Sequence, residues 1–335
     1  MLTPDAIDAH LDALAKPQGS LGRLERIAAR LALTQQSLRP QTRPRQIVLF
    51  AGDHGAVNSG VSAWPSAVTT AMMATIARGR ASSNALAHAA DCDLRLLDMG
   101  SITPLSPPHP PFMIERRIAA GTANLACGPA MTAAQLDAAW DAGAAEARAS
   151  IAQGYRVLLA GEMGIGNTTA AACLTVLLTG ADPAIATGKG AGANDAMRAQ
   201  KQAIVASAAA REQGKLASDP KSAIAGLCGF EIAAMAGFYA AAAQAGATIL
   251  LDGYVTTAAA LIAQHLSPGT ADQMIAAHLS AEPGHRAALA ALGLEPMLEW
   301  EMRLGEGTGA LTALPLLDAA AALLTNVATL AEVIG

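Results

Sequence analysis

The sequence predicts an α/β protein with a doubly wound, mainly parallel, Rossmann-like sheet and a smaller helical part formed by the N- and C-terminal segments. Four short, largely apolar runs each end in an acidic residue with a glycine close by. Long alanine-rich stretches separate these runs, and both ends of the chain lack them. Strands that alternate with helices in this way are typical of a parallel sheet covered on both faces.

The four apolar runs are the expected strands, because parallel strands covered on both faces are apolar over most of their length. They span residues 47–53, 94–100, 157–162 and 248–253, and their acidic residues are Asp53, Asp98, Glu162 and Asp252. Ligands of such folds bind beyond the carboxyl ends of the strands. We therefore expect these four carboxylates at the ligand-binding edge of the sheet.

Helices are expected between and beyond the strands. The alanine-rich residues 69–78 and 168–179 suit crossover helices, and both ends of the chain look helical. We accordingly predict an α/β domain of residues 45–295 and a smaller helical domain of residues 1–44 plus 296–335.

Composition excludes several classes of function. The chain of 335 residues has a net charge of −5, from 22 basic and 27 acidic residues, which argues against nucleic acid as a partner. Its four cysteines lie far apart without a CxxC pair, which favours a reduced, cytoplasmic protein over a disulfide scaffold or a zinc site. The first twenty residues contain three aspartates and no apolar core, so no signal peptide is expected.

Residues 223–251 form a long apolar segment that resembles a membrane span. It consists mostly of alanine and glycine and contains four glycines, whereas a spanning helix needs about 20 strongly apolar residues. We predict a fully buried helix followed by a buried strand, and no membrane partner.

Two glycine-rich turns are candidate anion sites. Residues 161–169, GEMGIGNTT, follow a strand and open a helix, where unpaired N–H groups and the helix dipole favour an anion. The turn lacks both the Walker lysine and the dinucleotide glycine spacing. Residues 188–192, GKGAG, add a cation. The two turns indicate one phosphate held without a metal, and the candidate phosphate- and ribose-binding residues are Gly164, Gly166, Asn167, Lys189 and Gly190.

The most informative motif is RLGEGTGA at residues 303–310, which places Glu306 among three glycines. Glycine allows positive φ and close approach of the backbone to a ligand, at an entropic cost. One interpretation is a C-cap turn with an exposed glutamate. The other is a carboxylate held beside a bound ligand, where it acts as a base.

Other polar groups leave alternatives open. Asp53, His54 and residues 280–285 contain candidate metal ligands, although an Asp beside a His is more often a hydrogen-bonded pair. His278 has no partner at ligand spacing and is expected at the solvated surface. Met72 either fills the core or lines a pocket for an aromatic ring.

Seven segments of the chain resemble the nicotinate-nucleotide:dimethylbenzimidazole phosphoribosyltransferase family, a family of glycosyltransferases that activate the lower-ligand base in cobalamin biosynthesis. In family order they are LDALAKPQGSLGRLE (11–25), AGDHGAVNSGVSAWPSAVT (51–69), GTANLACGPAM (121–131), GEMGIGNTT (161–169), GFEIAAMAG (229–237), SAEPGH (280–285) and RLGEGTGA (303–310). Each segment alone is a weak signal. All seven in order are a strong one.

The resemblance implies roles for particular residues. Glu306 would be the base, Glu162 and Lys201 would also be catalytic, and Leu304 and Met163 would flank the flat benzimidazole ring. Met72, as a methionine that could line an aromatic-ring pocket, is a further candidate base-binding residue. It implies no metal or cofactor, and a homodimer whose α/β domain binds nucleotide and base. The chain departs from the family pattern at Lys189 and Ala191, where arginine and threonine are usual, and at Ala71, where many members have glutamine. These departures bear on phosphate binding and on the preferred base.

The reaction that the resemblance implies consumes nicotinate mononucleotide and dimethylbenzimidazole. Three other functions stay open on the residues alone. A metal-dependent phosphohydrolase would use Asp53, His54, Asp98, Asp252 and His285. A nicotinamide-linked dehydrogenase fits the sheet but lacks the glycine fingerprint. A non-catalytic nucleotide-binding module would have no use for Glu306.

Overall fold

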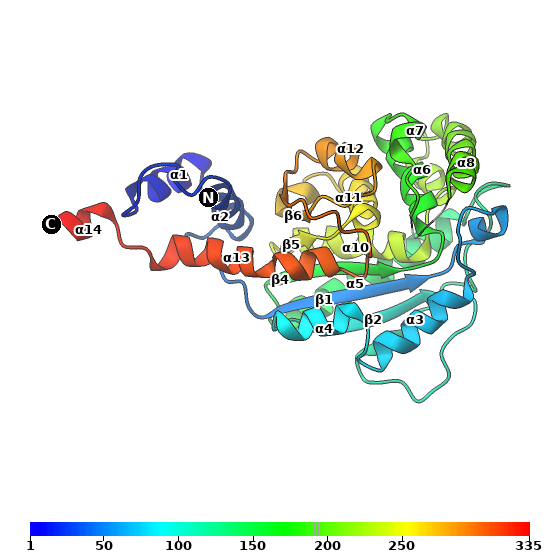
Figure 1. Cartoon of the computed structure of the whole chain (residues 1–335), viewed down its shortest axis with the longest axis horizontal. Coiled ribbons are helices and arrows are strands. Elements are labelled where there is room, and N and C mark those ends of the chain that lie inside the picture. Colours follow the sequence, from blue (N-terminus) through cyan, green and yellow to red (C-terminus); the bar gives the residue numbers. More distant parts are fainter. Residues whose placement is uncertain (191, 193) are drawn as a thin grey trace.

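The computed structural model describes residues 1–190, 192 and 194–335. Its centre is one seven-stranded sheet, in the order β3-β2-β1-β4-β5-β6-β7, and all neighbouring strands are parallel (Figure 1). The strands are β1 (Arg45–Gly52), β2 (Asp93–Gly100), β3 (Met113–Glu115), β4 (Val157–Met163), β5 (Thr248–Leu251), β6 (Met274–His278) and β7 (Pro296–Leu298). The strand order reverses direction between β1 and β4, and ligands of doubly wound sheets bind at such a point.

The four predicted strands, β1, β2, β4 and β5, are confirmed and occupy the middle of the sheet. The sequence analysis did not identify β3, β6 and β7, which lie toward the two edges. Each of the three is at most five residues long, and β7 begins with a proline, which is tolerated at a sheet edge. β6 reads MIAAH, and alanine has a low preference for strands.

Helices cover both faces of the sheet (Figure 1). One face carries α3 (Ala67–Ala77), α4 (Ser82–Ala89) and the first part of α13 (Thr308–Asn326), and the other carries α5 (Ala133–Ala152), α6 (Asn167–Thr179), α10 (Phe230–Gln244) and α11 (Tyr254–Leu266). The remaining helices are α1 (Pro4–Ala13), α2 (Arg23–Gln35), η1 (Gly55–Ser59), α7 (Pro183–Ala186), α8 (Asp195–Gln213), α9 (Pro220–Ala225), η2 (Thr270–Gln273), α12 (Gly284–Ala291) and α14 (Leu330–Ile334). The crossover helices expected at 69–78 and 168–179 are α3 and α6.

The central strand β1 shows how the sheet divides the core. Val48 and Phe50 belong to the cluster of buried side chains beneath α5, α6, α10 and α11. Ile47, Leu49 and Ala51 belong to a second cluster with α3, α4 and α13 on the other face. Successive side chains of a strand point to opposite faces, so one apolar run supplies both clusters.

The two ends of the chain meet in a separate helical region. Buried side chains of α1, α2 and the last part of α13 form a third cluster, which includes Ile7, Leu11, Ala28, Ala320 and Leu324. Figure 1 shows α13 running from the sheet to this region, next to α1, α2 and α14. One helix therefore connects the cavity described below to the terminal segments, while the division into two domains at the stated boundaries stays a prediction.

Two apolar helices, α10 and α13, bear on the question of a membrane span. In the apolar segment 223–251, residues 230–244 form α10, whose first thirteen residues are all buried. The strand β5 follows this helix, as predicted. Among the described residues, α13 alone is long and apolar enough to cross a membrane, and 61% of that stretch is buried inside the protein.

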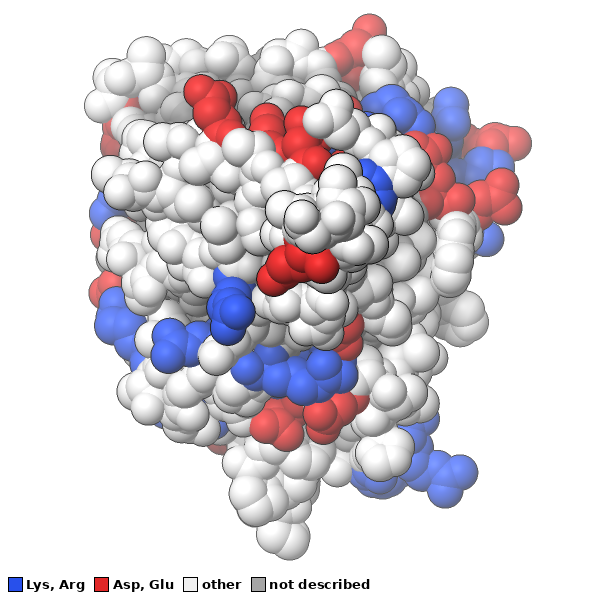
Figure 2. Space-filling view, turned by 90° about the vertical axis from the view of Figure 1, so that its left-hand side faces the viewer, with Lys and Arg blue, Asp and Glu red and all other residues white. Residues whose placement is uncertain are grey.

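On the part of the surface that Figure 2 shows, Lys and Arg side chains lie beside Asp and Glu side chains and form no continuous basic band.

Candidate active site

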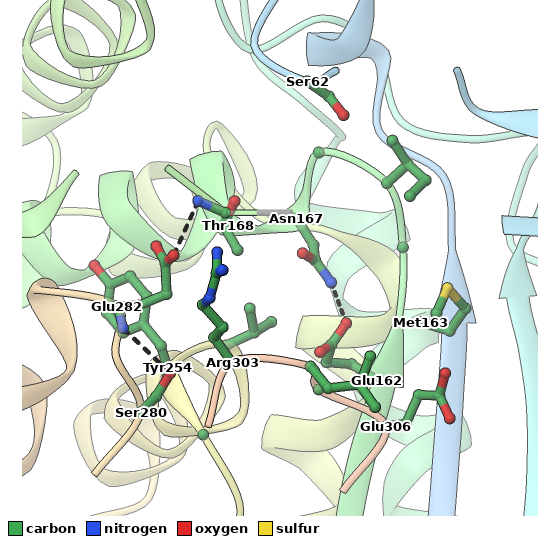
Figure 3. A pocket seen from close by; sticks show the side chains of 18 of the residues that line it. Ser62, Glu162, Met163, Asn167, Thr168, Tyr254, Ser280, Glu282, Arg303 and Glu306 are labelled. Carbon is green, nitrogen blue, oxygen red and sulfur yellow. Dashed lines mark hydrogen bonds between the residues drawn. The ribbon is translucent and has the colours of Figure 1, made fainter. Parts of the chain in front are cut away.

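A cavity of about 400 Å³ opens at the carboxyl ends of β4, β5 and β6 (Figure 3). This volume is typical of small-molecule sites. Its walls come from the β4–α6 turn, the glycine loop before α8, the β5–α11 and β6–α12 connections and the loop before α13. Of the residues predicted for the site, those that line the cavity are Glu306, Glu162, Gly164, Gly166, Asn167, Lys189, Gly190, Leu304, Met163 and Met72. Lys201 lies just outside it.

The Glu306 turn has an unusual backbone. Gly305, Glu306 and Gly307 have φ of 88°, 56° and 70°, so three consecutive residues are left-handed. A Cβ on Gly305 would collide with Oε1 of Glu162, and a Cβ on Gly307 would collide with Ile47. Glycine is therefore required on both sides, and Glu306 alone carries a side chain there. That side chain is 1% exposed, so the interpretation as an exposed C-cap glutamate is wrong.

The carboxylate of Glu306 is held by the start of α4. Oε2 accepts a hydrogen bond from Ser83 Oγ at 3.0 Å and a longer one from Ser83 N at 3.4 Å. Oε1 has no hydrogen-bond partner among the described residues. The backbone N–H of Glu306 donates to the carbonyl of Glu162 at 3.2 Å. Sequence analysis missed Ser83, because a contact across 223 positions leaves no local signal.

Glu162 is the second buried carboxyl group of the cavity. Burial raises its pKa from the ordinary 4.5 to about 8, and the nearby carboxylate of Asp252 adds to the increase. A short hydrogen bond from Asn167 Nδ2 to Oε2 opposes these effects. Figure 3 shows this pair on one side of the cavity, with Glu306 below. Glu162 is therefore protonated at neutral pH.

Asp252 and His278 are two further buried residues that line the cavity. Asp252 Oδ1 accepts from the N–H of Ala310 at 2.9 Å, near the start of α13, and lies 3.6 Å from His278 Nε2. Burial raises the pKa of Asp252, against the opposing effects of His278 and the backbone N–H groups. The expectation that His278 is solvated is wrong, because its side chain is 4% exposed. It ends β6, a strand that the sequence analysis did not identify.

Residues 280–285, which the sequence analysis considered only as a source of metal ligands, support the second glycine loop through hydrogen bonds. The N–H of Ser280 donates to Nδ1 of His285 at 2.8 Å, so Nε2 carries the proton and donates to Thr257 Oγ1 at 2.9 Å. Burial lowers the pKa of His285 to about 3, which keeps the ring neutral. Glu282 Oε1 in turn accepts from the N–H of Gly190 at 2.9 Å.

The two lysines occupy different positions. Lys201 is fully buried, and its Nζ donates at 2.7 Å to Oγ1 of Thr168, which does line the cavity. Burial lowers the pKa of Lys201 to about 8, although the carboxylate of Glu282 opposes this. Lys189 is half exposed and pairs with Asp195 at 2.8 Å. Lys189 is also one of the two departures from the family pattern in this loop. The other, Ala191, lies outside the described residues.

Arg303 is a cavity residue that the sequence analysis did not select. Its side chain stands between the Glu282 and the Asn167–Glu162 sides of the cavity (Figure 3). No hydrogen bond or ion pair to the guanidinium occurs within the described part of the chain. Ala71, the other departure from the family pattern, is exposed and does not line the cavity.

The candidate metal ligands are engaged elsewhere. His54 Nε2 pairs with Glu231 Oε1 at 2.6 Å, and Asp53 Oδ2 accepts from the N–H of Ile102 at 2.8 Å. Asp98 caps the chain after β2 by accepting from Ser101 N and Oγ at 2.8 and 2.6 Å. Thus only Glu162 and Asp252, of the four strand-end carboxylates, line the cavity. Within residues 1–190, 192 and 194–335, no group of three or more His, Cys, Asp or Glu side chains is arranged to hold a metal ion.

A doubly wound parallel sheet, a glycine turn at a helix start and buried carboxyl groups around one cavity define a nucleotide-binding α/β enzyme. Comparison with known proteins specifies which one. The model of a family described as phosphoribosyltransferase matches residues 3–334, and the chain belongs to this family. The family resemblance seen in the sequence motifs is thereby confirmed.

Named relatives extend over nearly the whole chain. Nicotinate-nucleotide–dimethylbenzimidazole phosphoribosyltransferase of Thermus thermophilus is 45% identical over 322 residues, 96% of this chain and 95% of the relative. The enzyme of the same name from Pseudomonas putida is 45% identical over 334 residues, 99% of this chain and 94% of the relative. The crystal structure of CobT from Thermus thermophilus superposes with a TM-score of 0.93 at 44% identity and covers 98% of both chains.

The raised pKa of Glu162 predicts a pH-dependent stability. Between about pH 4.5 and pH 8 the folded protein keeps this proton, whereas the unfolded chain has lost it. The free energy of unfolding therefore falls as pH rises through this window, by up to about 1.4 kcal/mol per pH unit. In Glu162→Gln this contribution is absent, so we expect its denaturant-unfolding free energy to fall less steeply than that of wild type.

The control is Glu299→Gln, which makes the same change at an exposed position. Its profile should run parallel to that of wild type. If the Glu162→Gln profile is also parallel to wild type, Glu162 does not hold a proton in the folded state at neutral pH.

Proposed function

We propose that the protein transfers the phosphoribosyl group of nicotinate mononucleotide to dimethylbenzimidazole, giving α-ribazole phosphate and nicotinate for the lower ligand of cobalamin. The observation that carries this proposal is the Glu306 carboxylate: buried, fixed through Oε2, and placed in the wall of a cavity whose neighbouring surface is apolar. Leu304, Met163 and Met72 supply that apolar surface. It suits a flat aromatic base better than a sugar or a phosphate.

The reaction needs one base and no acid. An unprotonated ring nitrogen of dimethylbenzimidazole attacks C1′ of the ribose, and the C1′–N bond to the pyridinium breaks. The electron pair of that bond returns to the pyridine nitrogen, so nicotinate leaves with a neutral ring. The other ring nitrogen of the base loses its N–H proton to Glu306. Attack from the face opposite the leaving group changes the β-linkage to an α-linkage.

The phosphate end of the nucleotide is assigned to the glycine turns. Gly164, Gly166 and Asn167 lie at the start of α6, where backbone N–H groups and the helix dipole favour an anion. Lys189 and Gly190 also line the cavity, and Gly190 lies next to Thr168 in the first turn of α6. Arg303 adds a guanidinium inside the cavity, and a guanidinium binds carboxylate or phosphate through paired hydrogen bonds.

Glu162 and Lys201 act around the ribose. Lys201 reaches the cavity through the hydroxyl of Thr168, which it orients by the 2.7 Å hydrogen bond. Its ammonium also offsets the negative charge of Glu282, which holds Gly190. Glu162 is protonated at neutral pH and therefore presents a hydroxyl donor to the ribose rather than a second negative charge.

We further propose a cytoplasmic homodimer, as the family resemblance implies. Large apolar side chains such as Trp300 and Ile185 are more than half exposed in the single chain, and a partner subunit would cover part of that surface. Sedimentation equilibrium of the purified protein should give twice the mass of the chain. A monomer at micromolar concentration would contradict the dimer.

The proposed function predicts a base-dependent release of nicotinate. Purified protein incubated with nicotinate mononucleotide and dimethylbenzimidazole should yield nicotinate and a new α-ribotide in equal amounts by chromatography. Without dimethylbenzimidazole, release should fall to background. Release that does not depend on the base would identify a nucleosidase-like hydrolase, and no release in either case would favour a binding module.

The base role predicts a specific loss in Glu306→Gln. Glutamine keeps the shape of the side chain but does not accept the proton, so we expect kcat to fall by at least about 10²-fold. Binding of nicotinate mononucleotide, measured by calorimetry, should change little. Near-full activity of the folded variant would exclude Glu306 as the base.

A further inference from the structure

The start of α4 makes a contact with the cavity that the proposed chemistry has not yet used. Ser83 is fully buried, and both its hydroxyl and its backbone N–H point at one atom, Oε2 of Glu306, at 3.0 and 3.4 Å. The other carboxylate oxygen, Oε1, has no such partner within the described residues. The carboxylate is thus bound on one side only.

We propose that Ser83 is a positioning residue for the transfer reaction: it fixes Oε2 of Glu306 and so presents Oε1 to the N–H of the incoming base. The inference rests on the proposed function, because it assigns Ser83 a role in that reaction.

Both ends of the Glu306 side chain are then fixed. Its backbone is held by the left-handed turn and by the hydrogen bond to the carbonyl of Glu162. Its carboxylate is held by Ser83. A base must lie within hydrogen-bond reach of the proton it takes, and a long side chain fixed at one end only would spend much of its time elsewhere.

Ser83 makes this contact without adding charge. Its hydroxyl and its helix-start N–H both donate to Oε2 of Glu306. The first turn of α4 reads Ser-Ser-Asn, and the titratable side chain of this helix, His88, lies in its last turn. The other titratable groups that line the cavity are Glu162, Lys189, Asp252, Tyr254, His278, Glu282 and Arg303.

The test compares Ser83→Ala with a matched control on the same turn, Ser82→Ala, whose side chain is exposed. We would measure kcat from about pH 5 to pH 9 with both substrates saturating, because kcat reports groups in the enzyme–substrate complex. The base substrate also titrates, but identically with every variant. Loss of the hydrogen bond that fixes Oε2 should lower kcat by about tenfold across this range. The KM for nicotinate mononucleotide should change little, because its binding does not depend on the orientation of this carboxylate.

Two further variants separate positioning from a merely structural role. Ser83→Thr keeps the hydroxyl and should keep the wild-type profile. Ser83→Cys is close to serine in size but is a weak donor, so it should lower kcat as alanine does. Ser83→Cys provides the measurement if Ser83→Ala does not fold. Ser82→Ala should match wild type throughout.

The outcomes distinguish a failure of the Ser83 role from a failure of the proposed function. If wild type is active and Glu306→Gln is inactive, but Ser83→Ala and Ser83→Cys keep the wild-type profile, the role of Ser83 is overturned and the function stands. A rate loss that Ser83→Thr shares with Ser83→Ala would also overturn it, since a loss that the hydroxyl does not rescue is the signature of a structural effect. If wild type forms no ribotide, or Glu306→Gln keeps full activity, the proposed chemistry fails and the role of Ser83 fails with it.

Discussion

The site depends on a close contact between β4 and the turn that precedes α13. A Cβ on Gly161 would lie 2.7 Å from the carbonyl carbon of Glu306 and similarly close to Leu49, so only glycine in the strand lets the turn pack directly on it. This contact brings residues about 145 positions apart, by the numbering of Gly161 and Glu306, onto the same sheet edge. Glu162, the next residue of the strand, then accepts the backbone N–H of Glu306. Any side chain at Gly161 would displace both carboxyl groups together, because they are joined through this contact.

Three buried carboxyl groups line one cavity, and each accepts a hydrogen bond from a different residue. Asp252 accepts a backbone N–H at the start of α13, Glu162 accepts the amide of Asn167, and Glu306 accepts Ser83. All three donor residues belong to the first turn of a helix. Ala310 and Ser83 donate backbone N–H groups there, which lack intrahelical partners, whereas Asn167 donates its side-chain amide. The doubly wound fold places such helix starts at the carboxyl edge of the sheet, so the same topology that forms the cavity also supplies its donors.

Local patterns in the sequence predict those parts of the structure that local forces determine. The apolar runs identified β1, β2, β4 and β5, and the glycine context singled out Glu162 and Glu306. The short strands β6 and β7, of which β7 lies at the sheet edge, escaped detection because alanine and proline carry little strand signal. His278 was misplaced for the same reason, since its burial follows from the strand that it ends. Ser83 depends on long-range packing, and nothing in its neighbouring residues distinguishes it from an ordinary polar position. Arg303 begins the RLGEGTGA motif, but the motif does not show that its side chain enters the cavity.

The protonation state of Glu162 matters for the role of Glu306. An ionised Glu162 would place a second negative charge beside the carboxylate that we propose as the base. Because burial raises the pKa of Glu162 to about 8, that group is neutral at physiological pH and adds no such charge. The two carboxyl groups also differ in their donors. Glu162 receives one amide hydrogen bond, whereas Glu306 receives both a hydroxyl and a helix-start N–H.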